Sequence, residues 1–174
     1  MNEVSLELVR GNITTLRVDA IVNAANGSLL GGGGVDGAIH AAAGRALLEE
    51  CRALPLVDGV RCPTGEARMT GGHALRCKWV IHTVGPVYNG KKDCATLLAS
   101  CYTSCLHLAG ERGLESIAFP NISTGIYGYP KGEAARVAVD TVRGEAGKHP
   151  TLKRVVFVCF DGENYALYKD LLGL

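Results

Sequence analysis

Hydrophobic and polar positions follow the period of a β-strand in some segments of this chain and that of an α-helix in others. Segments of the two kinds alternate. Ser5–Val9 alternates polar and apolar residues, which is typical of a half-buried strand. Trp79–Val84 and Arg154–Phe160 are nearly continuous runs of β-branched and aromatic residues, as expected for central strands covered on both faces. Shorter runs predict further strands over Asp19–Val22, Ser116–Phe119 and, as a weaker signal, Glu66–Thr70.

Segments with helical periodicity lie between these strands. They are Val35–Ala43, Arg45–Ala53, Cys94–Arg112, Gly132–Ala146 and Asn164–Leu172, and Pro130 stands where a proline can open a helix. The alternation of strands and helices predicts an α/β fold, with helices on both faces of one mostly parallel or mixed sheet. No linker, repeat or low-complexity segment divides the 174 residues, so we expect residues 1–174 to form one domain.

Charge and cysteine content narrow the class of protein. Eighteen Lys and Arg residues against seventeen Asp and Glu give a net charge of +1, and proteins that bind nucleic acid through its phosphates usually carry a marked basic excess. The seven cysteines form no C-x-x-C pair, and Cys94, Cys101 and Cys105 share one face of a predicted helix, which indicates a reduced core. The N-terminus lacks the apolar segment of a signal peptide, and no apolar run could span a bilayer. We therefore expect a cytoplasmic monomer that does not bind membranes, and the charge balance disfavours nucleic acid as a partner without excluding a local basic patch.

Glycine is the unusual component: the chain has 23 glycines, and the densest clusters of them fall in two loops. The first loop leaves the strand near Val22 and includes the run Gly31–Gly34 before a helix. Glycines leave backbone N–H groups accessible, and a helix N-terminus adds about half a positive charge, so this loop predicts a phosphate site without Lys or Arg. A G-x-G-x-x-G match is present, but it does not follow its strand directly as a dinucleotide-binding turn would. The alternative is a surface loop that binds nothing.

The second loop, Pro120–Tyr129, also joins a strand to a helix. Its residues Ser123, Thr124, Gly125 and Gly128 can offer backbone and hydroxyl donors, while Tyr127 and Tyr129 can enclose a sugar or base. Ligands of such sheets bind beyond the carboxyl ends of the strands, where the two loops would face each other. A pair of such loops suits a pyrophosphate, or a nucleotide with a sugar at both ends.

Four motifs then carry a family resemblance. They are Asp19–Asn26 (DAIVNAAN), Gly31–His40 (GGGGVDGAIH), Ile81–Pro86 (IHTVGP) and Ile122–Pro130 (ISTGIYGYP). In this order they resemble the macrodomains, and most closely the MacroD-type ADP-ribosyl hydrolases and O-acetyl-ADP-ribose deacetylases, from Leu6 through Leu172. The resemblance implies a three-layer α/β/α sandwich with a central mixed sheet, an ADP-ribose cleft across the two loops, and catalysis without a metal or other cofactor.

The resemblance also implies residue roles. Asp36 would be the general base that orients or deprotonates a water, and Asn26 would hold hydroxyls of the distal ribose. Phe160 would stack on adenine, and Asn12 with the backbone of Ile13 would contact the edge of the base. The diphosphate and distal ribose would be cradled by Gly33, Gly34, Val35, Ser123, Thr124, Gly125, Ile126 and Tyr127.

One residue departs from the family pattern. The family usually has Gly-Asp-Ile where this chain has Gly11-Asn12-Ile13. An Asn can still accept a hydrogen bond through its side-chain carbonyl, but the bond loses its charge assistance. We therefore expect weaker selectivity for adenine than an Asp-bearing relative would show.

The residues alone leave structural alternatives open. Asp36 could merely stabilise a helix N-terminus, Asn26 could hold a turn, and Phe160 could belong to the core. We interpret His40, four residues after Asp36, as its helix pair or a core histidine, and His82 as buried and hydrogen-bonded. Beside a bound phosphate the pKa of Asp36 should rise.

Two classes of function remain open, and RNA binding is a third that the net charge of +1 disfavours. The first is a hydrolase that releases ADP-ribose from O-acetyl-ADP-ribose and from mono-ADP-ribosylated Asp or Glu side chains of proteins. The second is a module that binds ADP-ribose without turning it over. Asp36, Asn26 and the intact glycine run favour the enzyme, because a pure binding module has no need of a base.

Overall fold

Six strands form one mixed sheet in the computed structural model, which describes residues 1–174. In the order β1-β6-β5-β2-β4-β3, every neighbouring pair is parallel except β3 and β4, which pair antiparallel at one edge. The strands are β1 (Ser5–Arg10), β2 (Ala20–Ala24), β3 (Ala67–Gly71), β4 (Trp79–Thr83), β5 (Ser116–Phe119) and β6 (Arg154–Cys159).

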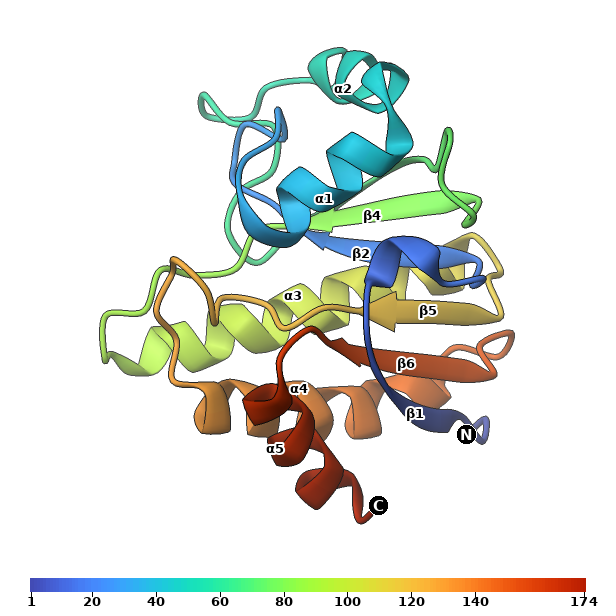
Figure 1. The fold of residues 1–174 in the computed structure, drawn as a ribbon, viewed down its shortest axis with the longest axis vertical. Helices are drawn as coiled ribbons and strands as arrows, with labels where there is room; N and C mark the ends of the chain where they lie inside the picture. The colour runs from blue at the N-terminus through green and yellow to red at the C-terminus, as the bar shows by residue number, and fades with distance from the viewer.

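Helices cover both faces of the sheet (Figure 1). One face packs against α3 (Lys92–Glu111), α4 (Lys131–Glu145) and α5 (Gly162–Leu172), and the other against α1 (Gly34–Ala43) and α2 (Arg45–Arg52). Two short 3₁₀ turns, η1 (Ile13–Thr15) and η2 (Ala146–Lys148), complete the elements. The predicted three-layer α/β/α sandwich is confirmed.

The strand pleat explains why there are two cores. Successive side chains of a strand point to opposite faces, so in β2 Ala20 and Val22 enter one hydrophobic cluster while Ile21 enters the other. The first cluster has 27 buried residues and lies under three helices, whereas the second has 16 and lies under two. All seven cysteines are buried free thiols, as the shared helical face of three of them predicted.

Some predicted boundaries were wrong by a few residues, and Asp19 shows a physical reason. Its backbone N–H donates to the hydroxyl of Ser116 (2.8 Å), and its Oδ2 accepts from the backbone N–H groups of Glu115 (2.7 Å) and Ser116 (3.1 Å). Asp19 therefore caps the start of β5 and does not extend β2. β2 instead runs two residues further, to Ala24. β6 ends at Cys159, which leaves Phe160 just beyond the strand.

None of the helices combines the length and the apolar character needed to cross a membrane. The cytoplasmic location and the monomeric state stay predictions.

Candidate functional site

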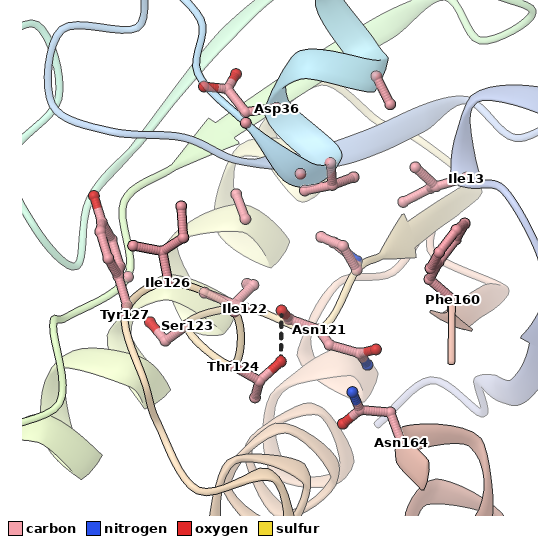
Figure 2. A pocket seen from close by; sticks show the side chains of 18 of the residues that line it. Ile13, Asp36, Asn121, Ile122, Ser123, Thr124, Ile126, Tyr127, Phe160 and Asn164 are labelled. Carbon is pink, nitrogen blue, oxygen red and sulfur yellow. Dashed lines mark hydrogen bonds between the residues drawn. The ribbon is translucent and has the colours of Figure 1, made fainter. Parts of the chain in front are cut away.

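A cavity of about 650 Å³ opens at the carboxyl ends of the strands, between the two glycine-rich loops. The structure brings every predicted site residue to its lining: Asn12, Ile13, Asn26, Gly33, Gly34, Val35, Asp36, Ser123, Thr124, Gly125, Ile126, Tyr127 and Phe160. In Figure 2, Asp36 lies at one end of this cavity and Phe160 with Ile13 at the other.

The first loop, between β2 and α1, depends on glycine at two points. Gly34 begins α1 with φ +58°, in the left-handed region that glycine adopts most readily. A Cβ on Gly37 would lie 2.6 Å from the carbonyl oxygen of Gly32, so only glycine allows this close approach. Neither the glycines Gly32 to Gly34 nor the following Val35 and Asp36 use their backbone N–H groups in a hydrogen bond within the protein.

Asn26 holds this loop in shape. Its Oδ1 accepts from the backbone N–H (3.2 Å) and the hydroxyl (2.6 Å) of Ser28, and its Nδ2 donates to the carbonyl of Gly31 (3.0 Å). These bonds show that Asn26 holds a turn, which was the structural alternative for this residue. Asn26 also lines the cavity. A Cβ on Gly32 would lie 3.1 Å from Asp36 Oδ2 and 3.3 Å from Asn26 Nδ2, so both side chains lie against the same glycine.

The second loop is fastened to the chain that follows β4. Ser123 has φ +68°, its hydroxyl donates to the carbonyl of Pro86 (2.9 Å), and the N–H of Tyr88 donates to the carbonyl of Tyr127 (2.8 Å). A side chain on Gly85 would collide with the Ser123 hydroxyl. These contacts hold the loop at the wall of the cavity.

Two expectations for this loop were wrong. The hydroxyls of Ser123 and Thr124 donate to carbonyl oxygens of the protein, and the N–H of Gly128 donates to Gly125, so these donors are already engaged. Tyr129 is buried in the core beside Tyr88, with ring centroids 4.8 Å apart, and does not line the cavity. The unpaired donors are the backbone N–H groups from Ser123 through Tyr127.

The cavity thus has two rows of unpaired backbone N–H groups, one from each loop. The charged side chains in its lining are Asp36, Lys131 and Asp161, and Lys131 lies within ion-pair distance of Asp161 (3.8 Å) and Glu163 (3.2 Å). Rows of N–H groups at a loop and a helix N-terminus form a binding site for an anion such as a phosphate group.

Asp36 is almost completely buried at the first turn of α1. Its Oδ1 accepts from Asn23 Nδ2 (2.8 Å) and lies 3.5 Å from His40 Nε2. Burial raises the pKa of Asp36, while the bond from Asn23 and the charge that His40 carries when protonated lower it. The pKa of Asp36 is therefore raised even without a ligand. The main cause is burial, and not the bound phosphate that the sequence led us to expect.

The two histidines take the places interpreted from the sequence. His40 pairs with Asp36 across one helical turn. His82 is fully buried, and burial lowers its pKa to about 3. Its ring nitrogens contact Asn23 Nδ2 (3.1 Å) and Thr70 Oγ1 (2.9 Å).

At the other end, Phe160 is 83% exposed while it lines the cavity, so the core alternative for this residue is wrong. Asn12 is the N-cap of η1, and its Oδ1 accepts from the backbone N–H (3.0 Å) and the hydroxyl (2.7 Å) of Thr14. Both lone pairs of that oxygen are engaged, so the carbonyl we expected to accept from adenine is not available. The polar group of Asn12 that has no partner within the protein is its Nδ2 amide.

Five polar side chains at or behind the cavity were not predicted: Asn23, Asn121, Lys131, Asp161 and Asn164. Asn23 carried a signal, since it is the only polar side chain within the apolar strand Ala20–Ala24 and must find partners there. The others lie in loops or helices where polar residues are ordinary, and no pattern distinguishes them.

Comparison with known proteins places this chain and its fold in one family. Residues 22–138 match the family described as "Macro domain", and the chain belongs to the macrodomains. It is 53% identical to an O-acetyl-ADP-ribose deacetylase of Cronobacter sakazakii, over 97% of this chain and 93% of that protein. It is 52% identical to a macro domain-containing protein of Cupriavidus necator, over 97% of both chains.

Solved structures agree with this assignment. A macrodomain of Oceanobacillus iheyensis with ADP superposes with a TM-score of 0.93 at 46% identity, covering 99% of this chain and 92% of that one. A Trypanosoma brucei macrodomain in complex with ADP-ribose superposes with a TM-score of 0.88 at 45% identity, covering 97% and 69%.

Proposed function

We propose that this macrodomain binds ADP-ribose and hydrolyses esters of its distal ribose. The substrates are O-acetyl-ADP-ribose and proteins mono-ADP-ribosylated on Asp or Glu side chains. Relatives about 53% identical carry the name O-acetyl-ADP-ribose deacetylase, and similar folds have been solved with ADP and ADP-ribose. Both substrates contain a carboxylic ester of the same sugar, so one site suits both.

The observation that carries this proposal is the buried carboxylate of Asp36 beside two rows of open N–H groups. A diphosphate along those rows would place one sugar toward Phe160 and the other toward Asp36 (Figure 2). An exposed aromatic ring is a platform on which a base can stack, so the nucleoside end belongs at Phe160. The esterified ribose then lies at Asp36.

Hydrolysis adds one water across the ester C–O bond and yields a carboxylic acid and a free ribose hydroxyl. A general base removes a proton from that water as its oxygen attacks, and we assign this role to Asp36. Its raised pKa makes the carboxylate a better proton acceptor than an ordinary Asp. Asn26, which shares the loop and lies against the same glycine, would hold ribose hydroxyls.

The test is a turnover assay on both ester types, with free ADP-ribose detected by mass spectrometry, beside calorimetric titration with ADP-ribose. We expect turnover of both substrates and binding of the product. Binding without turnover of either ester would identify an ADP-ribose binding module, which is the alternative function. Turnover of the acetyl ester alone would restrict the enzyme to the small substrate.

A further inference from the structure

Four buried polar side chains, Asp36, Asn23, His82 and Thr70, form a chain that runs from the cavity into the sheet. Asn23 on β2 donates through Nδ2 to Asp36 Oδ1 (2.8 Å) and contacts His82 Nδ1 on β4 (3.1 Å). His82 Nε2 lies 2.9 Å from the hydroxyl of Thr70 on β3, which lies 3.3 Å from the Gly71 carbonyl. His82 does not line the cavity, so it cannot contact a ligand there.

The direction of each hydrogen bond in this chain follows from chemistry. An amide nitrogen only donates, so the two hydrogens of Asn23 Nδ2 point to Asp36 and to His82. His82 Nδ1 must then be the bare nitrogen, and its proton is on Nε2, where it donates to Thr70. Thr70 in turn can donate its own hydroxyl hydrogen to Gly71.

The opposite orientation of Asn23 would be unfavourable. A reversed amide would present its oxygen to the Asp36 carboxylate, a contact between two acceptors, and it would face the bare nitrogen of His82 as well unless the imidazole moved its proton from Nε2 to Nδ1. In the observed orientation Asn23 Oδ1 is buried without a partner, which is unfavourable. The two bonds from Nδ2 offset that cost, and removing one of them weakens the preference for this orientation.

We propose that His82 is a positioning residue for Asp36, acting through Asn23. The bare Nδ1 of His82 holds the Asn23 amide with its NH₂ group toward the carboxylate, which keeps Asp36 ionised in a buried place. This inference rests on the proposed function only in taking Asp36 as the base.

Other groups around this chain are few. Asp36 is faced by His40 on its own helix α1, and His82 is faced by Cys51 Sγ on α2, 3.8 Å from Nε2, and by the ring of His40 at 6.4 Å between centroids. Burial raises the pKa of the Cys51 thiol to about 11, so it is neutral. His40 is therefore the other ionisable side chain in contact with Asp36.

Two variants of His82 separate positioning from packing. In His82→Asn the side-chain oxygen can take the place of Nδ1 and accept from Asn23, whereas His82→Leu fills the space without an acceptor. We measure kcat, KM and the pH–rate profile of each on the acetyl ester. For His82→Leu we expect the acid limb of kcat to move up by about one to two pH units, because an unconstrained Asn23 no longer stabilises the carboxylate. His82→Asn should keep the wild-type limb, and KM should change little in both.

A merely structural role predicts a different result. Lost packing would lower thermal stability and reduce kcat equally at every pH, without moving the acid limb. Equal profiles for His82→Leu and His82→Asn would therefore overturn the proposal. His40→Asn serves as the control for the other nearby titrating group: the shift caused by His82→Leu should persist in the double variant.

Carbon-13 NMR of the Asp36 carboxyl reports the same shift without any turnover. It keeps the test valid if the protein binds ADP-ribose and hydrolyses nothing. If His82→Leu does not fold, nitrogen-15 NMR of the imidazoles in the wild-type protein decides: we expect His82 to carry its proton on Nε2 from pH 5 to 8. A proton on Nδ1 would reverse the direction of the chain and refute the inference.

Discussion

At one end of the cleft Asp36 is buried and hydrogen-bonded, and at the other Phe160 is 83% exposed while it lines the same cavity. The buried end is held from behind by three strands, through Asn23, His82 and Thr70. The exposed end is held by short local turns. A reacting group needs a fixed position and charge, whereas a stacked base needs mainly an accessible flat surface. The difference predicts that substitutions at the buried end change rate, and those at the exposed end change affinity.

The largest effect is expected at the buried end. Asp36→Ala should lower kcat about 10²–10⁴-fold, the usual contribution of a general base. ADP-ribose affinity should persist, because the phosphate donors are backbone groups. Asp93→Ala removes an exposed acid from the first turn of α3, outside the cavity lining, and should leave kcat unchanged. A near-normal rate in Asp36→Ala would show that another group is the base.

The middle of the cleft comes next. Gly33 has ordinary backbone angles and nothing within 4 Å of a built Cβ, so Gly33→Glu should fold normally. The new carboxylate would repel the diphosphate, and ADP-ribose affinity should fall about a hundredfold, which is about 2.7 kcal/mol. Gly144→Glu, an equally open position on α4, is the matched control and should bind normally. Unfolding of the Gly33 variant would instead show that the loop serves stability.

At the exposed end, Phe160→Ala should weaken ADP-ribose binding by about 1–3 kcal/mol and leave kcat at saturation nearly unchanged. Its unfolding midpoint should hardly move, since the ring is already exposed. Phe157→Ala, three residues earlier and buried, should do the reverse and lose about 3–5 kcal/mol of stability. Calorimetry measures the affinity of both variants for ADP-ribose, and thermal unfolding measures their stability. Unchanged affinity in Phe160→Ala would show that Phe160 does not stack on the base.

The smallest effect concerns Asn12. Its oxygen is engaged by Thr14, so it presents a donor where adenine's exocyclic amine would need an acceptor. In Asn12→Asp one oxygen can keep the cap while the other accepts from the amine. We expect ADP-ribose to bind tighter by about 1 kcal/mol and inosine-diphosphate-ribose to bind more weakly. Titration of both ligands with both proteins checks this; the same preference in each would mean that position 12 does not contact the base.

Periodicity was enough to predict the sheet and its helices, because burial on two faces imposes continuous apolar strands such as Trp79–Thr83. It could not predict which donors remain open. Ser123 and Thr124 were expected to offer hydroxyls, yet their partners are carbonyls whose positions depend on how the loop folds back. Likewise, nothing local to Asn23 and His82 indicates that a strand pairing brings them within 3.1 Å. Pairwise contacts between distant segments are tertiary information.

The cradle of backbone N–H groups has a consequence for how this site changes by mutation. A site made from Lys or Arg is lost when one codon removes the cation. Here the donors belong to the main chain, so no single truncation of a side chain removes them. The replacements that damage the site are those that add atoms, as at Gly37, or force a left-handed residue to change, as at Gly34. Saturation mutagenesis of the two loops, followed by selection for ADP-ribose binding, should therefore select against added atoms at the glycines, and against truncation only where a side chain holds a loop in place, as at Asn26 and Ser123.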